Sequence, residues 1–558
     1  MAVMPDHQAP LPPTPSPGRI LEEPGATPAP QASRPDSTWA PLRTPTFRLL
    51  WSVTLVANIC VWMNDVAAAW MMTSMTTSPV LVALVQTAST LPVFLLGLPS
   101  GALADILDRR RYFIFTQFWV AIVAVLLCAA VALDAMSAPL LLALTFANGI
   151  GMAMRWPVFS ALIPEVISKP LLPSAMALNA VAMNASRIVG PLVAGAIIAS
   201  AGTLWVFVLN ALLSIVAGFI LLRWQREQAA INPLGRERLP SAMRVGLQFV
   251  KESPRMRAVI ARTVSFFFMS TAIMALLPLT AKRFDGIGFI SGAGVFTVLL
   301  ASMGAGAIIG AMFLPRIRQA LPSEALVLTG TCLQAASTIG VALAPNLALA
   351  IVCMMIAGLS LLSTANTLGV KAQMALPNWV RARGMSAYQM SIMGGMALGS
   401  ALWGKIASLT SVPASLITAA ITGVVCMLVV QRVFLDRQAL EDLSPSKAWE
   451  PPKHSQPEEG RVVVHIEFII NPAKAKRFRT LMQESRRSRM RQGALAWRML
   501  HSMERPERYV EEIVDESWIE HLRRFDRVTA ADVALRERKL AFHVLDTPPR
   551  VTRYFETD

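Results

Sequence analysis

LPVFLLGLPSGALADILDRRR, residues 91–111, is a long apolar stretch that ends abruptly in charge. Its first fourteen residues carry no ionisable side chain, whereas five of the last seven are charged. A helix with about 20 apolar residues can cross a hydrocarbon core about 30 Å thick. A basic cluster directly after such a helix favours the cytoplasmic side of a membrane. This pattern of an apolar span and a short polar break recurs along most of the chain.

The composition requires a lipid environment for most of the chain. Apolar and aromatic residues make up 54% of the 558 residues, charged residues only 15%, and the mean hydropathy is +0.50. A water-soluble chain could not bury so much apolar surface. The net charge of +16 would suggest nucleic-acid binding in a soluble protein, but a positive-inside bias explains it here, and we expect no nucleic-acid partner.

Twelve apolar stretches follow one another between Phe47 and Arg432. Basic residues gather in the breaks after the second, fourth, sixth, eighth and tenth stretches, which predicts that both termini are cytoplasmic. We therefore expect an all-α polytopic membrane protein. The expected spans are 47–72, 80–104, 112–133, 139–163, 174–200, 203–222, 258–281, 291–314, 323–344, 346–371, 383–409 and 411–432.

The spans divide into two related halves of six. A constant shift of 209 residues maps four glycines of the first half onto four glycines of the second. One such match means little, but four in different helices indicate a duplication, a design in which transporters hold substrate between the halves. The pairs are Gly101 and Gly310, Gly149 and Gly358, Gly190 and Gly399, and Gly195 and Gly404.

The remaining segments complete a six-part organisation. Within the loop that joins the halves, SAMRVGLQFVKES predicts an amphipathic helix on the cytoplasmic leaflet, with Met243, Leu247 and Val250 on its apolar face. The expected parts are a Pro-rich disordered cytoplasmic tail at 1–46, the first half at 47–222, the loop at 223–257, the second half at 258–432, a linker at 433–460 and a cytoplasmic domain at 461–558.

The last segment predicts a small α+β domain. Its pattern of strands and helices reads β-α-β-β-α-β, the ferredoxin-like order. Val464, Ile466 and Phe468 alternate along the first strand. We expect them on an exposed sheet face that a second copy would cover, so that the domain forms a homodimer.

We single out three ionisable side chains in the expected spans: Asp65, Arg155 and Arg187. A charge within the bilayer costs several kcal/mol unless it is paired or faces water, so these residues are candidates for coupling to protons or substrate. Asp65 and Arg187 could pair across a central cavity, where proton binding would compete with the pairing. The alternative is that Asp65 lies at a wet helix end.

GALADILDRRR resembles the G-x-L-A-D-x-x-G-R-R signature of the major facilitator superfamily. The resemblance implies that Gly101 allows two helices to touch and that Asp105, Arg109 and Arg110 form a charged gate. Asp108 departs from the signature, because glycine usually stands at that position, and it adds an acidic partner for the arginines.

The fifth span contains RIVGPLVAG, which resembles the GP-x-x-G-G signature of drug/proton antiporters, with Ala194 replacing one glycine. Proline removes a backbone donor, so Gly190, Pro191 and Gly195 form either a hinge or a plain packing kink. Phrases such as WMNDVAAAWM look most like the enterobactin-exporter-like branch, often labelled transmembrane secretion effectors. The C-terminal domain resembles the dimeric α/β-barrel family that includes antibiotic-biosynthesis monooxygenases.

These resemblances imply an exporter in the bacterial inner membrane. We expect it to move a small amphipathic molecule, a drug or siderophore-like metabolite, by proton antiport with alternating access. Its partners would be the substrate, protons and the lipid bilayer. No Walker-type nucleotide motif, CxxC pair or metal spacing occurs in the sequence, so we expect no cofactor and no enzymatic activity. The alternatives are a transporter-derived sensor and a membrane-anchored monooxygenase-like enzyme.

Overall fold

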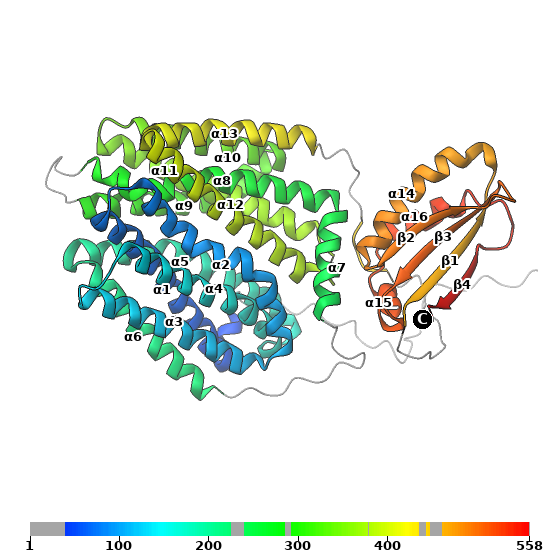
Figure 1. Cartoon of the computed structure of the whole chain (residues 1–558), viewed down its shortest axis with the longest axis horizontal. Coiled ribbons are helices and arrows are strands. Elements are labelled where there is room, and N and C mark those ends of the chain that lie inside the picture. Colours follow the sequence, from blue (N-terminus) through cyan, green and yellow to red (C-terminus); the bar gives the residue numbers. More distant parts are fainter. Residues whose placement is uncertain are drawn as a thin grey trace, which may run out of the picture.

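The computed structural model describes residues 39–224, 239–284, 292–377, 379–434, 442–446 and 460–556. Figure 1 shows a bundle of long helices and, beyond one end of the bundle, a small domain built on a sheet. We call this end of the bundle the domain end and the opposite end the distal end. Most of the expected N-terminal tail and linker lies outside the described residues.

The first half of the bundle contains six long helices that alternate in direction. Short breaks with proline or a capping side chain separate them, as at Ser137, whose hydroxyl accepts from the Leu140 amide. The helices are α1 (Pro45–Met75), α2 (Pro79–Ile106), α3 (Arg109–Ala132), α4 (Ala138–Val166), α5 (Leu172–Ala201) and α6 (Thr203–Arg223).

The second half repeats this arrangement after one shorter helix, α7 (Leu239–Glu252). Among the described residues, twelve helices are long and apolar enough to cross a membrane, which confirms the expected number of spans. The helices of the second half are α8 (Pro254–Lys282), α9 (Gly292–Ala320), α10 (Ser323–Leu343), α11 (Leu347–Met374), α12 (Arg381–Leu409) and α13 (Val412–Val433).

The repeated glycines make equivalent contacts in the two halves. Gly149 in α4 packs against the backbone of α2, and Gly358 in α11 packs against the backbone of α9. Gly195 in α5 meets α9, and Gly404 in α12 meets α2. The first pair joins helices within each half, and the second pair joins the halves to each other. Close helix approach at equivalent places explains the spacing of 209 residues.

Helix α7 packs its apolar side against the domain end of the bundle. Val245 and Phe249 are buried, and the Phe249 ring meets that of Trp379 edge to face at 5.8 Å. Of the expected apolar face, Leu247 is 47% exposed, whereas Val250 packs on the bundle. The helical spacing was right, but Phe249 is the side chain that packs on the bundle, and Val245 lies against Gly493 of the C-terminal domain.

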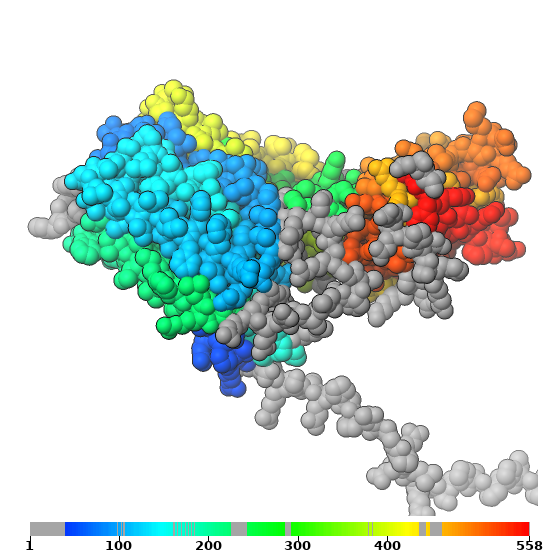
Figure 2. Space-filling model, turned by 60° about the horizontal axis from the view of Figure 1, so that its bottom comes forward, coloured from blue at the N-terminus to red at the C-terminus, as the bar shows by residue number. Residues whose placement is uncertain are grey.

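The C-terminal domain is a four-stranded antiparallel sheet with helices on one face. Its strand order is β2-β3-β1-β4, and the expected alternation of strands and helices is present, with the second helical stretch divided in two. Figure 2 shows its orange and red residues as a separate body beside the bundle. The elements are β1 (Val462–Ile469), α14 (Ala475–Arg491), β2 (Ala496–His501), β3 (Arg508–Asp515), α15 (Trp518–Asp526), α16 (Ala530–Leu540) and β4 (Arg550–Phe555).

The expectation of an exposed apolar face on β1 is wrong. Val464 and Phe468 are only 4% and 2% exposed, because they point toward the helices of the same domain. Phe468 packs on Phe478 of α14, with ring centroids 5.5 Å apart. A second copy is therefore not needed to cover these side chains.

Candidate transport site

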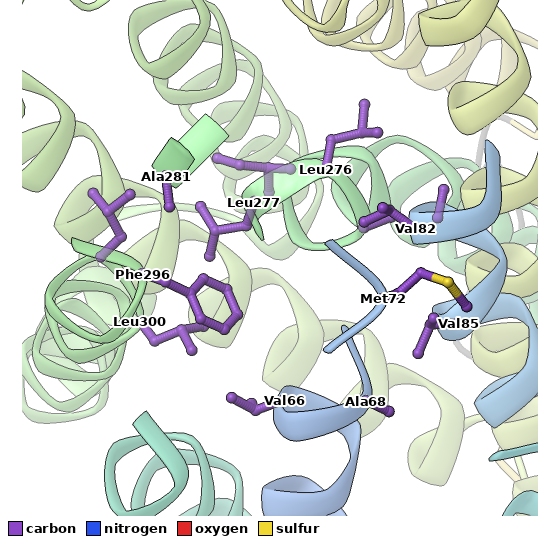
Figure 3. Close-up of a cluster of buried hydrophobic side chains, with 14 of the residues drawn as sticks. Val66, Ala68, Met72, Val82, Val85, Leu276, Leu277, Ala281, Phe296 and Leu300 are labelled. Carbon is purple, nitrogen blue, oxygen red and sulfur yellow. The ribbon is translucent and has the colours of Figure 1, made fainter. Parts of the chain in front are cut away.

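At the distal end, side chains from both halves form one buried apolar cluster. Figure 3 shows Val66 and Met72 of α1 in this cluster together with Leu276 of α8 and Phe296 of α9. Trp70 of α1 stacks on Phe296 with ring centroids 5.4 Å apart. Burial of apolar surface between the halves stabilises this contact. The distal end is therefore closed.

Polar contacts also join the halves. The Lys282 ammonium group of α8 donates to the Thr73 carbonyl of α1 at the distal end. The Thr87 hydroxyl of α2 lies 2.8 Å from the Ser400 hydroxyl of α12. Both contacts would have to break if the halves separated on this side.

The halves part along α5 and α9 toward the domain end. Ile188 of α5 contacts Gly304 of α9, where an added Cβ would lie 3.0 Å from the isoleucine Cγ2. Two turns nearer the domain end, on the same side of α5, Val181 is 53% exposed. Ile308 and Met312 continue the Gly304 side of α9 and are 49% and 70% exposed. The sides of α5 and α9 that face each other thus become accessible at the domain end.

Asp65 lies at the junction of the two halves, close to the closed distal end. Its two carboxylate oxygens accept from the Ser89 hydroxyl of α2 at 2.9 and 3.0 Å. A small cavity of about 10 Å³ adjoins the carboxylate and is lined in part by Gln86 of α2 and by Met274 and Ala275 of α8. A cavity of this size has room for about one water molecule. Asp65 therefore borders side chains of both halves at their junction.

Arg155 of α4 lies inside the first half and is only 1% exposed. One Nη atom donates to the Asn58 Oδ1 of α1 at 3.0 Å. Its Nε and its other Nη have no hydrogen-bond partner among the described residues. A buried cation held by one neutral amide is costly, which marks Arg155 as a functional candidate.

Arg187 of α5 points toward α1 and the second half. Its guanidinium carbon lies 5.2 Å from the centre of the Trp62 ring, a cation–π contact. It also interacts electrostatically with Tyr388 of α12. Among the described contacts Arg187 does not pair with Asp65, whose hydrogen-bond partner is Ser89. The expected pairing is therefore absent from this state of the protein.

The charged segment between α2 and α3 has a structural function at two positions. The Asp108 carboxylate caps α3 by accepting from the Arg111 amide at 2.8 Å. Arg110 binds the end of α6 through the carbonyls of Trp224, at 2.5 Å, and Leu222, at 2.9 Å. The departure from the family signature at Asp108 thus provides a helix cap.

The other expected gate residues are less constrained in the structure. An added Cβ at Gly101 would lie 3.9 Å from the Pro157 Cβ of α4, which is ordinary contact. Arg109 begins α3 and has partners. The side chain of Asp105 lies outside the described residues. The charged gate as a whole stays a prediction.

Gly190 and Gly195 mark two close helix crossings on α5. An added Cβ at Gly190 would lie 2.5 Å from the Trp62 Cβ of α1 and 3.0 Å from the Ile59 carbonyl oxygen. One at Gly195 would lie 2.5 Å from the Thr297 Oγ1 of α9. Pro191 lies between them, inside the helix. This segment therefore connects the first half, through α1, to the second half, through α9.

Sequence reasoning missed a charged cluster in the second half. Arg262 of α8 is buried and forms two contacts with the Glu324 carboxylate of α10, at 2.9 and 2.8 Å. Lys371 of α11 binds the same carboxylate. An arginine within an apolar span was the available signal, but the acidic partner lies about sixty residues away in the sequence.

Twelve spans in two duplicated halves, with ionisable side chains at and near their junction, define a membrane transporter of the major facilitator type. Solved transporters share this fold. A bacterial homologue of the human lysosomal transporter Spinster, in an inward-facing and occupied conformation, has a TM-score of 0.56 at 16% identity and covers 71% of this chain and 96% of its own. The nucleoside transporter NupG has a TM-score of 0.56 at 12% identity, covering 70% of this chain and all of its own.

The chain belongs to the transmembrane secretion effector family, whose model matches residues 36–558 and so includes the C-terminal domain. A staphyloferrin A transporter of Staphylococcus aureus is 22% identical over 61% of this chain and 84% of its own length. An uncharacterised transporter of the same superfamily from Bacillus subtilis, YfiS, is 28% identical over 32% of this chain and 42% of its own. The family and these relatives are transporters rather than enzymes.

Proposed function

We propose that this protein exports a small amphipathic molecule, a drug or siderophore-like metabolite, from the bacterial cytoplasm by proton antiport. The observation that carries the proposal is the position of Asp65. Its carboxylate lies between the halves, accepts hydrogen bonds from a neutral hydroxyl and borders a cavity with room for one water. A group that gains and loses a proton at this place can change the contact between the halves.

The expected cycle follows from the energetics of a charge in an apolar junction. An ionised carboxylate in such surroundings costs several kcal/mol, and protonation removes that cost. The protonated form therefore favours a closed distal end, and the ionised form favours an end that is open to water. A proton that enters from the distal side would close that side, and its release at the domain end would allow the next cycle.

The arginines supply the second part of the proposal. Arg155 has donors without partners in the first half, and Arg187 lies against the ring of Trp62. Together they would hold a polar or anionic group of the substrate, while apolar side chains of α5 and α9 contact its remainder. The gate residues Gly101, Asp105, Arg109 and Arg110 would control access at the domain end. We place that end in the cytoplasm because basic residues gather there.

The test is an accumulation screen in cells with dyes and siderophores, with and without the gene. We expect lower accumulation of at least one compound in cells that express the protein, and loss of the difference when the proton gradient is collapsed. Asp65→Asn keeps a group that can bind Ser89 but cannot titrate, so it should abolish uphill export. Asp134→Asn, an equivalent change at an exposed loop residue, is the matched control. Uphill export by Asp65→Asn at the wild-type rate would contradict the proposal.

A further inference from the structure

The C-terminal domain contains a cavity of about 380 Å³ between its sheet and its helices. Apolar side chains of the sheet form its floor, among them Val464, Ile466 and Val551. Phe525 of α15 and Leu540 of α16 add apolar surface from the helices. The volume falls within the range of small-molecule sites, about 300–1,000 Å³.

Positive charge surrounds this apolar floor. Five basic side chains line the cavity. Glu511 and Asp515 lie next to these cations, and a third carboxylate, Asp532, is engaged by Ser488 and Thr529. The basic residues are Arg489, Arg524, Arg536, Lys539 and Arg553.

The floor contributes one of these charges directly. Arg553 of β4 is exposed, and its Nε donates to the Nε2 of His521 at 3.3 Å. An imidazole nitrogen that accepts a hydrogen bond is unprotonated. The contact therefore orients the Arg553 guanidinium at the cavity without neutralising it.

Two buried polar groups at the cavity lack partners among the described residues. Gln492 is 3% exposed, and neither its amide nitrogen nor its amide oxygen has a hydrogen-bond partner. The Nε of Arg524 is also buried and unpartnered, although its Nη1 binds Asp515 at 2.7 Å. Leaving a buried donor without a partner costs about 1–3 kcal/mol. Such groups in the lining of a cavity indicate a ligand that would complete their hydrogen bonds.

We propose that this cavity binds a small amphipathic organic anion, with its carboxylate, sulfonate or phosphate group among the basic side chains and its apolar part on the sheet. Arg553 and Gln492 are the residues that the anion would contact. Arg524 and Lys539 would act through their fixed pairs with Asp515 and Glu511. This site is separate from the transport path in the bundle.

The site is next to a contact between α7 and the segment that follows α14. Gln492 lines the cavity, and the two following residues touch α7: Val245 lies against Gly493, and the Gln248 amide donates to the Ala494 carbonyl at 2.8 Å. A ligand that orders Gln492 therefore acts one residue away from the contact with the bundle.

The experiment measures binding of 8-anilinonaphthalene-1-sulfonate to the full chain in nanodiscs of neutral phosphatidylcholine. N-phenyl-1-naphthylamine, which has the same rings without the sulfonate, serves as the neutral probe, and empty nanodiscs give the background. We expect saturable binding of about one sulfonate probe per chain. Arg553→Gln and Gln492→Leu should each weaken this binding about tenfold and leave the neutral probe unaffected.

The controls separate recognition from unfolding and from bulk charge. Arg498→Gln removes a positive charge from an exposed residue of β2 outside the cavity lining, and it should bind the sulfonate as the wild type does. Gln492→Leu should not lower the melting temperature, because it removes a buried amide without partners. Arg553→Lys should restore part of the affinity. Equal binding of both probes, or an unchanged affinity in Arg553→Gln and Gln492→Leu, would overturn the proposal.

Discussion

At the scale of single residues, Arg155 and Arg262 are both buried in the bundle but differ in what surrounds them. Arg262 is matched by the Glu324 carboxylate, whereas Arg155 has one neutral partner, Asn58. Removing Arg262 would break this ion pair and lower stability, although Glu324 is partly exposed and would keep Lys371 as a partner. Removing an unmatched cation relieves a cost instead. The two positions therefore predict opposite effects on stability.

We expect Arg155→Met to keep or raise the melting temperature of the purified protein while it abolishes export. Methionine has a similar length and fills the site without a charge. Arg262→Met is the matched control and should lower the melting temperature. Thermal unfolding in the same detergent measures both variants. A marked loss of stability in Arg155→Met would show that the guanidinium is a structural group.

His521 makes the C-terminal domain sensitive to acid. Burial, together with the charges of Arg524 and Arg553, lowers the pKa of His521 against the opposing effect of Asp515. The unfolded chain then takes up a proton more readily than the folded one, so the free energy of unfolding falls as the pH drops below about 6.5. Stability from this group is complete above that pH and is lost below it.

His521→Asn should flatten this pH dependence, because an amide can donate to Asp515 and does not titrate. Hydrogen exchange of α15 in the full chain, at pH 7.5 and 5.5, measures the local free energy of opening. Titration of Asp515 and Glu511 does not contribute to the difference between pH 7.5 and pH 5.5. Burial acts to raise the pKa of Glu511, but Lys539 and Arg489 outweigh it and hold that pKa well below its usual range. An equal pH dependence in wild type and variant would exclude His521 as the cause.

The ionisable site residues could be chosen from the sequence, but their contacts could not. A charge within an apolar span is conspicuous, which identified Asp65, Arg155 and Arg187. Their observed partners are Ser89, Asn58 and Trp62, which are uncharged. Nothing in the local pattern distinguishes such partners from other polar or aromatic residues.

At the scale of helices, the glycines of the two recognised motifs have different tolerances. Gly190 lies against the α1 backbone, so a methyl group there has no space, whereas Gly101 has ordinary contact distance to Pro157. We expect Gly190→Ala to destabilise the protein by about 1–3 kcal/mol through overpacking. Gly101→Ala should have little effect on stability. Thermal unfolding of the two variants compares them directly, and equal melting temperatures would mean that α1 and α5 can adjust.

The sequence predicted the lengths and number of the helices well, and their faces less well. Apolar runs set the spans, since a bilayer requires a minimum length. In the sheet, alternation showed that Val464 and Phe468 share a face but not which face the helices cover. In α7, the pattern does not show that Phe249 packs on Trp379 of the bundle or that Val245 packs on Gly493 of the C-terminal domain.

At the scale of the whole molecule, α7 connects the C-terminal domain to the bundle. The Arg244 guanidinium binds the Glu516 carboxylate at 2.8 Å, and Arg527 lies 5.2 Å from the centre of the Trp379 ring. The ion pair is partly exposed and contributes at most about 1 kcal/mol. We infer that this ion pair orients the C-terminal domain on α7.

We expect Arg244→Glu to loosen the domain and to change the export rate, and Glu516→Arg in the same chain to restore both. Hydrogen exchange of α7 reports the loosening, and an export assay reports the rate. The double variant is the internal control, because it restores an ion pair between positions 244 and 516 with the two charges exchanged. If the double variant behaved like the sum of the single variants, the pair would have no part in docking.

A homodimer through the C-terminal domain stays a prediction on a different basis. The face of the sheet away from the helices carries exposed Leu500 and Tyr554 beside the ion pair of His465 and Glu512. Because this surface is partly polar, burying it in a dimer would gain less free energy than burying the apolar face that the sequence predicted. Sedimentation of the full chain in detergent, compared with a Leu500→Glu variant, tests it, and a monomer in both would contradict the homodimer.

The position of α7 between two bodies has a consequence in thermodynamic linkage. If an anion in the C-terminal domain alters the equilibrium between open and closed bundles by some factor, the state of the bundle must alter the affinity for the anion by that same factor. The occupancy of the anion site would then depend on transport through the bundle. The fraction of C-terminal domains that hold the anion would then report how the bundle is distributed between its open and closed states. A change in transport would change the amount of free anion in the cell.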